Sequence, residues 1–176
     1  MAASRSLHFS PDFCISCGTI TVDLRAQKVL LLFYRSTGEY LLPKGHKNIN
    51  ETMEAAAVRE TLEETGIRCE LLPHSFPHQA TPFVGDAEAS SAAGRMTTEP
   101  IAVQQRTSQG AWKIIFWFVA QADSTVARVE GMQEDYEQYD TVWADVGSAP
   151  GMMSREDDGE VVKMVIESVL GLGKST

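Results

Sequence analysis

Three glutamates in one short segment, Glu60, Glu63 and Glu64, are spaced so that their carboxylates could bind one metal ion. On a helix with about 100° between residues they lie within about 100° of each other, so their carboxylates converge on one side. Without a counter-ion these groups repel one another, and at least one would hold a proton. A hard divalent cation removes that cost, because carboxylate oxygens are ligands that Mg²⁺ or Mn²⁺ prefers. The spacing therefore predicts a metal-binding site, and a solvated acidic helix face is the alternative interpretation.

Positive side chains stand close to this segment in the sequence. Lys44, His46 and Lys47 surround Gly45, at the end of a short apolar stretch. Mg²⁺ keeps several waters and normally binds with the help of substrate phosphates. We therefore expect a small anionic, phosphate-containing substrate, with Lys44 and His46 contacting its oxygens.

One helix must carry the carboxylates. Residues 51–65 are predicted to form it, with Asn50 as the N-cap and Gly66 after the last residue. The residues predicted to pack on a sheet are Ala55, Ala56, Ala57, Val58 and Leu62, of which Ala55, Val58 and Leu62 point away from the carboxylates. A second helix is predicted over residues 157–170. Together with the strands below, these helices indicate an α/β protein.

The remaining elements are predicted from alternation and turn signals. Strands are expected at 17–24, 28–35, 40–42, 67–72, 101–106, 112–121 and 141–144, and 44–50 is expected to be a loop. Residues 1–13 are predicted to be a polar N-terminal arm, and residues 14–176 a single domain. Residues 74–98, rich in proline and small residues, are predicted to form a long flexible loop.

Composition excludes several classes of partner. The chain has 15 Lys and Arg residues against 24 Asp and Glu residues, a formal charge of −9, which argues against binding to nucleic-acid polymers or anionic membranes. No apolar run is long enough to span a bilayer, and the N-terminus shows no secretory signal. Three cysteines, an odd number, suit a reducing compartment. We therefore expect a cytoplasmic protein, with the nucleus also open, that is a monomer or a homodimer.

The segment from Gly45 to Ile67 resembles the Nudix box, G-x5-E-x7-R-E-U-x-E-E-x-G-U, in which U is a bulky apolar residue. All glycine and charged positions match, and only Thr61 departs, at the first U position. The resemblance implies a Nudix-type α/β/α sandwich with a mixed central sheet. It also implies a hydrolase that cleaves a nucleoside diphosphate linked to another group.

The resemblance also implies roles for individual residues. Glu60, Glu63, Glu64 and the Gly45 carbonyl would bind the metal, and Arg59 would orient the carboxylates with Glu51 as its ion-pair partner. Glu63 is our candidate for the base that takes the water proton, and Glu134, in a later acidic stretch, is the alternative.

The form Pro-Lys-Gly-His at residues 43–46 is similar to that of the asymmetric diadenosine tetraphosphate hydrolases. It implies a dinucleoside polyphosphate substrate, with Tyr139 as a base-stacking candidate and Arg35 as a further phosphate contact. Two alternatives stay open. One is a diphosphoinositol polyphosphate phosphohydrolase, which would need a broad basic surface, and the other is a non-catalytic Nudix module that binds a nucleotide.

Overall fold

A mixed β-sheet forms the centre of the molecule in our computed structural model, which describes residues 6–81, 96–108, 110–133 and 138–171. The long strands β1 (Phe13–Asp23) and β7 (Ala111–Gln121) lie side by side in parallel, and the other strand pairs are antiparallel. The main strand order is β3-β2-β1-β7-β5. In addition, β4 pairs with β1, β6 with β7 and β8 with β2. The remaining strand bounds are β2 Lys28–Tyr34, β3 Glu39–Leu41, β4 Lys44–His46, β5 Glu70–Leu71, β6 Ala102–Ser108 and β8 Tyr139–Asp145.

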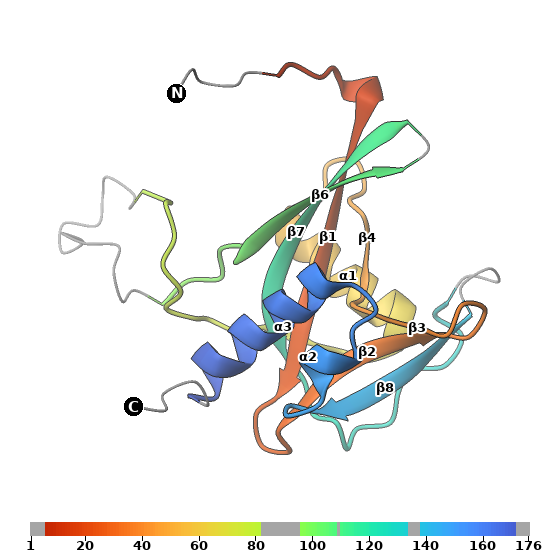
Figure 1. Cartoon of the computed structure of the whole chain (residues 1–176), viewed down its shortest axis with the longest axis vertical. Helices are drawn as coiled ribbons and strands as arrows, with labels where there is room; N and C mark the ends of the chain where they lie inside the picture. The colour runs from red at the N-terminus through yellow and green to blue at the C-terminus, as the bar shows by residue number, and fades with distance from the viewer. Residues whose placement is uncertain (1–5, 82–95, 109, 134–137, 172–176) are drawn as a thin grey trace.

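Helices cover both faces of this sheet. The helix α1 (Met53–Thr65) lies behind the sheet in Figure 1, and α2 (Ala149–Met152) and α3 (Glu156–Val169) lie in front of it. Val162, Val165 and Ile166 of α3 pack on the apolar residues of β1 and β7 that face forward. The other face of β1 and β7 packs against Ala56 and Ala57 of α1. The predicted α/β sandwich with a mixed sheet is confirmed, and α2 was not predicted.

The start of α1 differs from the prediction. The helix begins at Met53, and the Thr52 hydroxyl accepts a hydrogen bond from the backbone N–H of Ala55 at 3.2 Å. Asn50 lies before the cap with a φ of 62°, so it closes the loop and does not cap the helix. Gly66 does end the helix, in the left-handed conformation with a φ of 73°, as predicted.

Several strand limits also differ. Residues 44–46, predicted as loop, form β4 because they pair with residues 16–18 of β1. β1 begins at Phe13, earlier than predicted, because its parallel pairing with β7 runs on to Trp112. The strand predicted at 67–72 is reduced to Glu70–Leu71. A 3-10 helix at Ser10–Asp12 interrupts the predicted N-terminal arm. Most of the predicted flexible loop, residues 82–95, lies outside the described residues.

The predicted buried face of α1 was partly wrong: Ala56 and Ala57 pack on the sheet as predicted, but the other three residues do not form its buried face. Ala55 is exposed, and Val58 and Leu62 are only half-buried. The residues that α1 buries are Ala56, Ala57, Glu60, Thr61, Glu64 and Thr65. Because the side chains at this interface are small or polar, α1 can lie close to β1, and the carboxylates of Glu60 and Glu64 are buried against the sheet.

Thr61, the departure from the box, has a defined partner. Its hydroxyl lies 2.7 Å from that of Thr19 on β1, and Thr19 in turn lies 2.7 Å from Thr21. Thr61 also donates to the Ala57 carbonyl at 2.8 Å. The Thr61 hydroxyl thus gives the buried Thr19 hydroxyl a hydrogen-bond partner, which a bulky apolar residue at position 61 could not provide.

Gly18 allows the strands to approach closely. A Cβ atom on Gly18 would lie 2.4 Å from the Pro43 carbonyl oxygen and 2.6 Å from the Trp117 ring. We expect Gly18→Ala to lower the free energy of unfolding by about 1–3 kcal/mol, because it overpacks this contact. Gly147→Ala is the control, since nothing lies within 4 Å of its added Cβ. Urea unfolding of both variants measures the effect, and equal midpoints would contradict it.

Candidate active site

The guanidinium group of Arg59 binds three of the acids of the box. Its Nε and Nη2 donate to the two carboxylate oxygens of Glu51 at 2.8 and 2.9 Å. Its Nη1 donates to Glu60 at 2.7 Å and to Glu63 at 2.6 Å. Nη2 also donates to the His46 carbonyl of β4 at 2.9 Å. The ion pair expected between Arg59 and Glu51 is therefore present, and Arg59 joins α1 to β4.

These contacts shift pKa values in opposite directions. The hydrogen bonds from Arg59 are the main cause that lowers the pKa of Glu51, and the bond to Glu51 is the main cause that raises the pKa of Arg59. Both groups therefore stay charged across the neutral range.

Two carboxylates lie against the backbone of β4. Glu60 and Glu64 are 9% and 5% exposed. The backbone N–H of Lys44 donates to Glu64 Oε2 at 2.7 Å, and a Cβ atom on Gly45 would lie only 1.8 Å from Glu60 Oε2. A residue other than glycine at position 45 would thus displace Glu60.

The oxygen ligands available at this site are of the type that a hard cation prefers. Carboxylate oxygens from successive helical turns meet a strand backbone at Gly45, where no side chain intervenes. Among the described residues, however, no three acidic, histidine or cysteine side chains lie close enough together to bind one metal ion as they stand. Instead, the guanidinium group of Arg59 lies between Glu60 and Glu63 and neutralises their charges.

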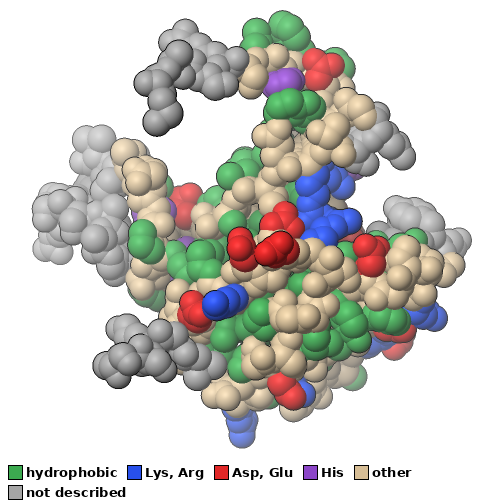
Figure 2. All heavy atoms as spheres, in the orientation of Figure 1, with side chains coloured by type: hydrophobic (Ala, Val, Ile, Leu, Met, Phe, Trp, Pro, Cys, Tyr) green, Lys and Arg blue, Asp and Glu red, His purple; other side chains and the backbone are tan. Residues whose placement is uncertain are grey.

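A cavity of about 640 Å³ opens beside the carboxylates and brings most of the predicted residues together. Its lining consists of Lys44, Gly45, His46, Asn48, Arg59, Glu60, Glu63, Glu64, Lys113, Gly131, Met132 and Tyr139. Acids from α1 and cations from β4 and β7 therefore share one space. On the face that carries α3, Figure 2 shows Lys and Arg side chains gathered next to acidic ones.

Lys113 belongs to this cavity, whereas from the sequence it is a candidate only for the basic surface that the inositol pyrophosphate alternative would need. It stands opposite Cys14 in the parallel β1–β7 register. Its pKa is lowered by burial and then by the nearby Lys44. A signal was present in the sequence, because Lys113 is the one charged residue within the otherwise uncharged stretch of residues 111–120.

His46 also lies among these cations. Its Nε2 lies 3.6 Å from Cys14 Sγ. Desolvation is the main cause that lowers the pKa of His46, followed by the charges of Lys113 and Lys44. Because the lowered pKa favours neutral imidazole, His46 suits hydrogen bonding more than a permanent charge.

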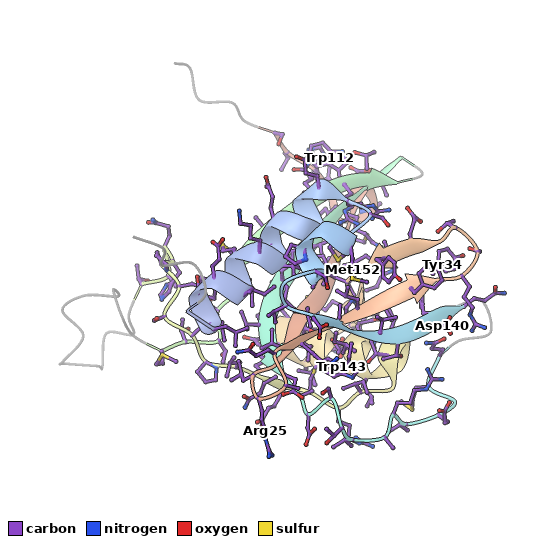
Figure 3. All side chains as sticks on the ribbon, turned by 60° about the horizontal axis from the view of Figure 1, so that its bottom comes forward. Arg25, Tyr34, Trp112, Asp140, Trp143 and Met152 are labelled. Carbon is purple, nitrogen blue, oxygen red and sulfur yellow. The ribbon has the colours of Figure 1, made fainter. Side chains whose placement is uncertain are left out.

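The aromatic and arginine candidates are placed differently. Tyr139 lines the cavity, with its ring centre 5.1 Å from that of Tyr34. Arg35 does not line it, because its Nε pairs with Asp140 at 3.4 Å. Figure 3 shows Tyr34 and Asp140 at the same end of the β2–β8 pair. Glu134, the alternative base, lies outside the described residues.

A larger cavity, of about 820 Å³, lies at the other end of β1. It is lined by the β1–β2 turn, residues 68–70 and residues 121–125. None of the box residues from 44 to 64 reaches it. The chemistry of the carboxylates therefore assigns the candidate active site to the smaller cavity.

Comparison with known families agrees with this geometry. The NUDIX domain profile matches residues 16–163. The chain belongs to the Nudix family. Its Nudix fold is confirmed, and as a Nudix hydrolase domain it is a pyrophosphohydrolase.

Solved structures share this fold over nearly the whole chain. A NUDIX-family hydrolase from Clostridium perfringens is 21% identical, with a TM-score of 0.59 and coverage of 91% of this chain and 97% of that one. An Ap4A hydrolase from C. elegans is 18% identical, with a TM-score of 0.62 and coverage of 90% and 98%. The mutator protein MutT from Bacillus halodurans is 18% identical, with a TM-score of 0.58 and coverage of 89% and 84%.

The helices of this fold are those of a globular sandwich. Across the described residues, none of them combines the length and the apolar character needed to cross a bilayer.

The Glu51–Arg59 pair predicts a pH-dependent contribution to stability. We expect Glu51→Gln to lower the free energy of unfolding by about 1–3 kcal/mol at neutral pH. Because the folded-state pKa of Glu51 lies below its ordinary 4.5, this difference should be complete above pH 4.5 and shrink as the pH falls further. Urea unfolding at several pH values measures it. Glu54→Gln, at an exposed position of the same helix, is the control. A difference that grows on acidification would contradict the argument.

Proposed function

We propose that the chain is a Mg²⁺-dependent hydrolase that cleaves an anhydride bond in a dinucleoside polyphosphate such as diadenosine tetraphosphate. One observation carries the proposal: a single cavity is lined both by the box carboxylates and by Lys44, His46 and Lys113. The acids suit a cation, and the basic residues suit phosphate oxygens beyond those that the cation neutralises.

Glu60, Glu63, Glu64 and the Gly45 carbonyl would hold Mg²⁺, for which Mn²⁺ can substitute. When bound, the ion supplies a lowered pKa for the attacking water and charge neutralisation at the phosphate. Arg59 holds Glu60 and Glu63 in place through its Nη1. Glu63 is the candidate base, because its side chain is 39% exposed, whereas Glu60 and Glu64 are buried. Arg59 binds Oε2 of Glu63, so the other oxygen, Oε1, would accept the water proton.

The basic side of the cavity supports a polyphosphate substrate. Lys44 and Lys113 can bind oxygens of successive phosphates, and His46 can donate a hydrogen bond. Tyr139 at the cavity edge offers an aromatic face for a nucleobase. The C. elegans protein that shares the fold is named as an Ap4A hydrolase, which agrees with this substrate class.

The inositol pyrophosphate alternative needs more unpaired cations than the described part of this site presents. Arg106 lies near Lys113, but its Nη2 binds Asp158 at 2.7 Å. Arg35 is paired with Asp140. The alternative of a non-catalytic module is disfavoured because every carboxylate of the box is present.

The carboxylates can be tested by one isosteric change. We expect Glu64→Gln to reduce kcat about 10³-fold, since a ligand carboxylate contributes several kcal/mol through the metal. The chain should stay folded, because a glutamine oxygen still accepts the Lys44 N–H bond. Phosphate release with Mg²⁺ and after chelation by EDTA provides the measurement, and Glu54→Gln is the control. Full activity of Glu64→Gln, or activity without any divalent cation, would refute the metal mechanism.

The substrate class can be tested separately by comparing dinucleoside polyphosphates, nucleotide sugars and inositol pyrophosphates. We expect Lys113→Met to raise KM for diadenosine tetraphosphate about tenfold, because a hydrogen bond to a charged group is lost. The effect on a two-phosphate nucleotide sugar should be smaller. Lys28→Met is the control, since Lys28 pairs with Asp145 on β8 and does not line the cavity. Preference for inositol pyrophosphates would refute the proposed substrate class but not the proposed hydrolysis of an anhydride bond.

A further inference from the structure

The outer edge of β6 has no strand partner among the described residues, since β6 pairs with β7 alone. Proteins commonly protect such an edge with proline, lysine, a bulge or a very short strand. β6 has seven residues, Ala-Val-Gln-Gln-Arg-Thr-Ser, and its register with β7 runs without a bulge. Its only charge, Arg106, is paired with Asp158. Apart from this one inward-pointing charge, the edge therefore lacks the usual protection.

The other strands at the margins of the sheet are protected. β3 has three residues and β5 has two, and each carries an acid, Glu39 and Glu70. β8 carries two acids, Asp140 and Asp145, which pair with Arg35 and Lys28 but remain exposed. In a chain with a net charge of −9, acidic edges repel a second copy. β6 is a long edge that carries no acid.

An apolar surface adjoins this edge. Val103 is 62% exposed and lies opposite Phe116 on the face of the sheet that α1 covers further along. Ile114 and Trp112 follow on the same face of β7, and both are only partly buried, although the ring of His8 lies 3.9 Å from that of Trp112. Figure 3 places Trp112 at the end of the molecule where the β6–β7 hairpin lies. The exposed edge and the apolar side chains thus form one continuous surface, which we call the β6 surface.

We propose that two copies of this chain associate through the β6 surface, with the two β6 strands antiparallel about a two-fold axis at Gln105. Continuous pairing then places Gln104 opposite the partner's Arg106 and Val103 opposite the partner's Thr107. The exposed residues Val103, Gln105 and Thr107 stay on one face, so the apolar surfaces of both copies meet side by side.

Charges in this register are complementary. The Gln104 side chain donates to Asp157 and Asp158 at the start of α3. The partner's Arg106, opposite Gln104, therefore comes close to Asp157. Asp157 has no ion pair within the described part of its own chain, so two such contacts related by symmetry would offset repulsion between the acidic helix starts.

Sedimentation equilibrium tests the association. We expect the full chain to have a mass near twice 19.3 kDa. Val103→Lys should weaken the dimer at least about tenfold, because it places a charge in the apolar surface. Val126→Lys, at a position that is also 62% exposed, should leave it unchanged. Circular dichroism checks that both variants are folded. A wild-type monomer at every concentration, or a dimer indifferent to Val103→Lys, would overturn the proposal.

Disulfide trapping tests the register. Gln105→Cys would face itself across the axis at a Cα separation of about 4.5–5.5 Å, within the range of a disulfide. Val103→Cys would lie about 13 Å from its copy. We expect mild oxidation to cross-link Gln105→Cys only, with the wild-type chain showing the background from its own cysteines. Cross-linking of Val103→Cys but not Gln105→Cys, or of neither variant, would overturn the proposed pairing.

Discussion

The electrostatic cost of grouping acids is the constraint on which the site depends, and Arg59 meets it. One guanidinium group contacts Glu51 before the helix, Glu60 and Glu63 within it, and the His46 carbonyl on β4. Without that group, neighbouring carboxylates at low exposure would repel one another or take up protons. The same bonds hold α1 against the sheet, so the acids and the strand that faces them are positioned together.

The helix can approach the sheet this closely because its buried side chains are small or polar. Ala56 and Ala57 pack on Cys17, and Thr61 reaches Thr19 through its hydroxyl. Gly45 completes the approach, since no larger residue would leave room for the Glu60 carboxylate. Core packing and the geometry of the candidate active site therefore have the same cause, a short distance between α1 and the strands β1 and β4.

Strand alternation then separates the two chemical halves of the cavity. Gly45 faces Glu60 on the α1 side, whereas its neighbours Lys44 and His46 have cross-strand partners on the opposite face of β1. Lys113 joins that second face through its pairing with Cys14. A chain with a strongly negative net charge thus presents a local group of cations beside its acids, which is why net charge alone could not exclude an anionic substrate.

The helix with its carboxylates, the glycine that ends it and the apolar strands of an α/β sheet could all be predicted from the sequence. These follow from local spacing, since periodicity and turn residues act over short stretches of chain. The buried face of α1 and the lining of the cavity depend instead on contacts made only in the folded chain. The buried face of α1 depends on how close β1 lies, so Ala55 is exposed although its neighbours Ala56 and Ala57 are buried. Lys113 lines the cavity because strand pairing places it beside Cys14, whereas Arg35 lies outside the cavity and forms an ion pair with Asp140. Such contacts join residues far apart in the chain, and no local pattern specifies them.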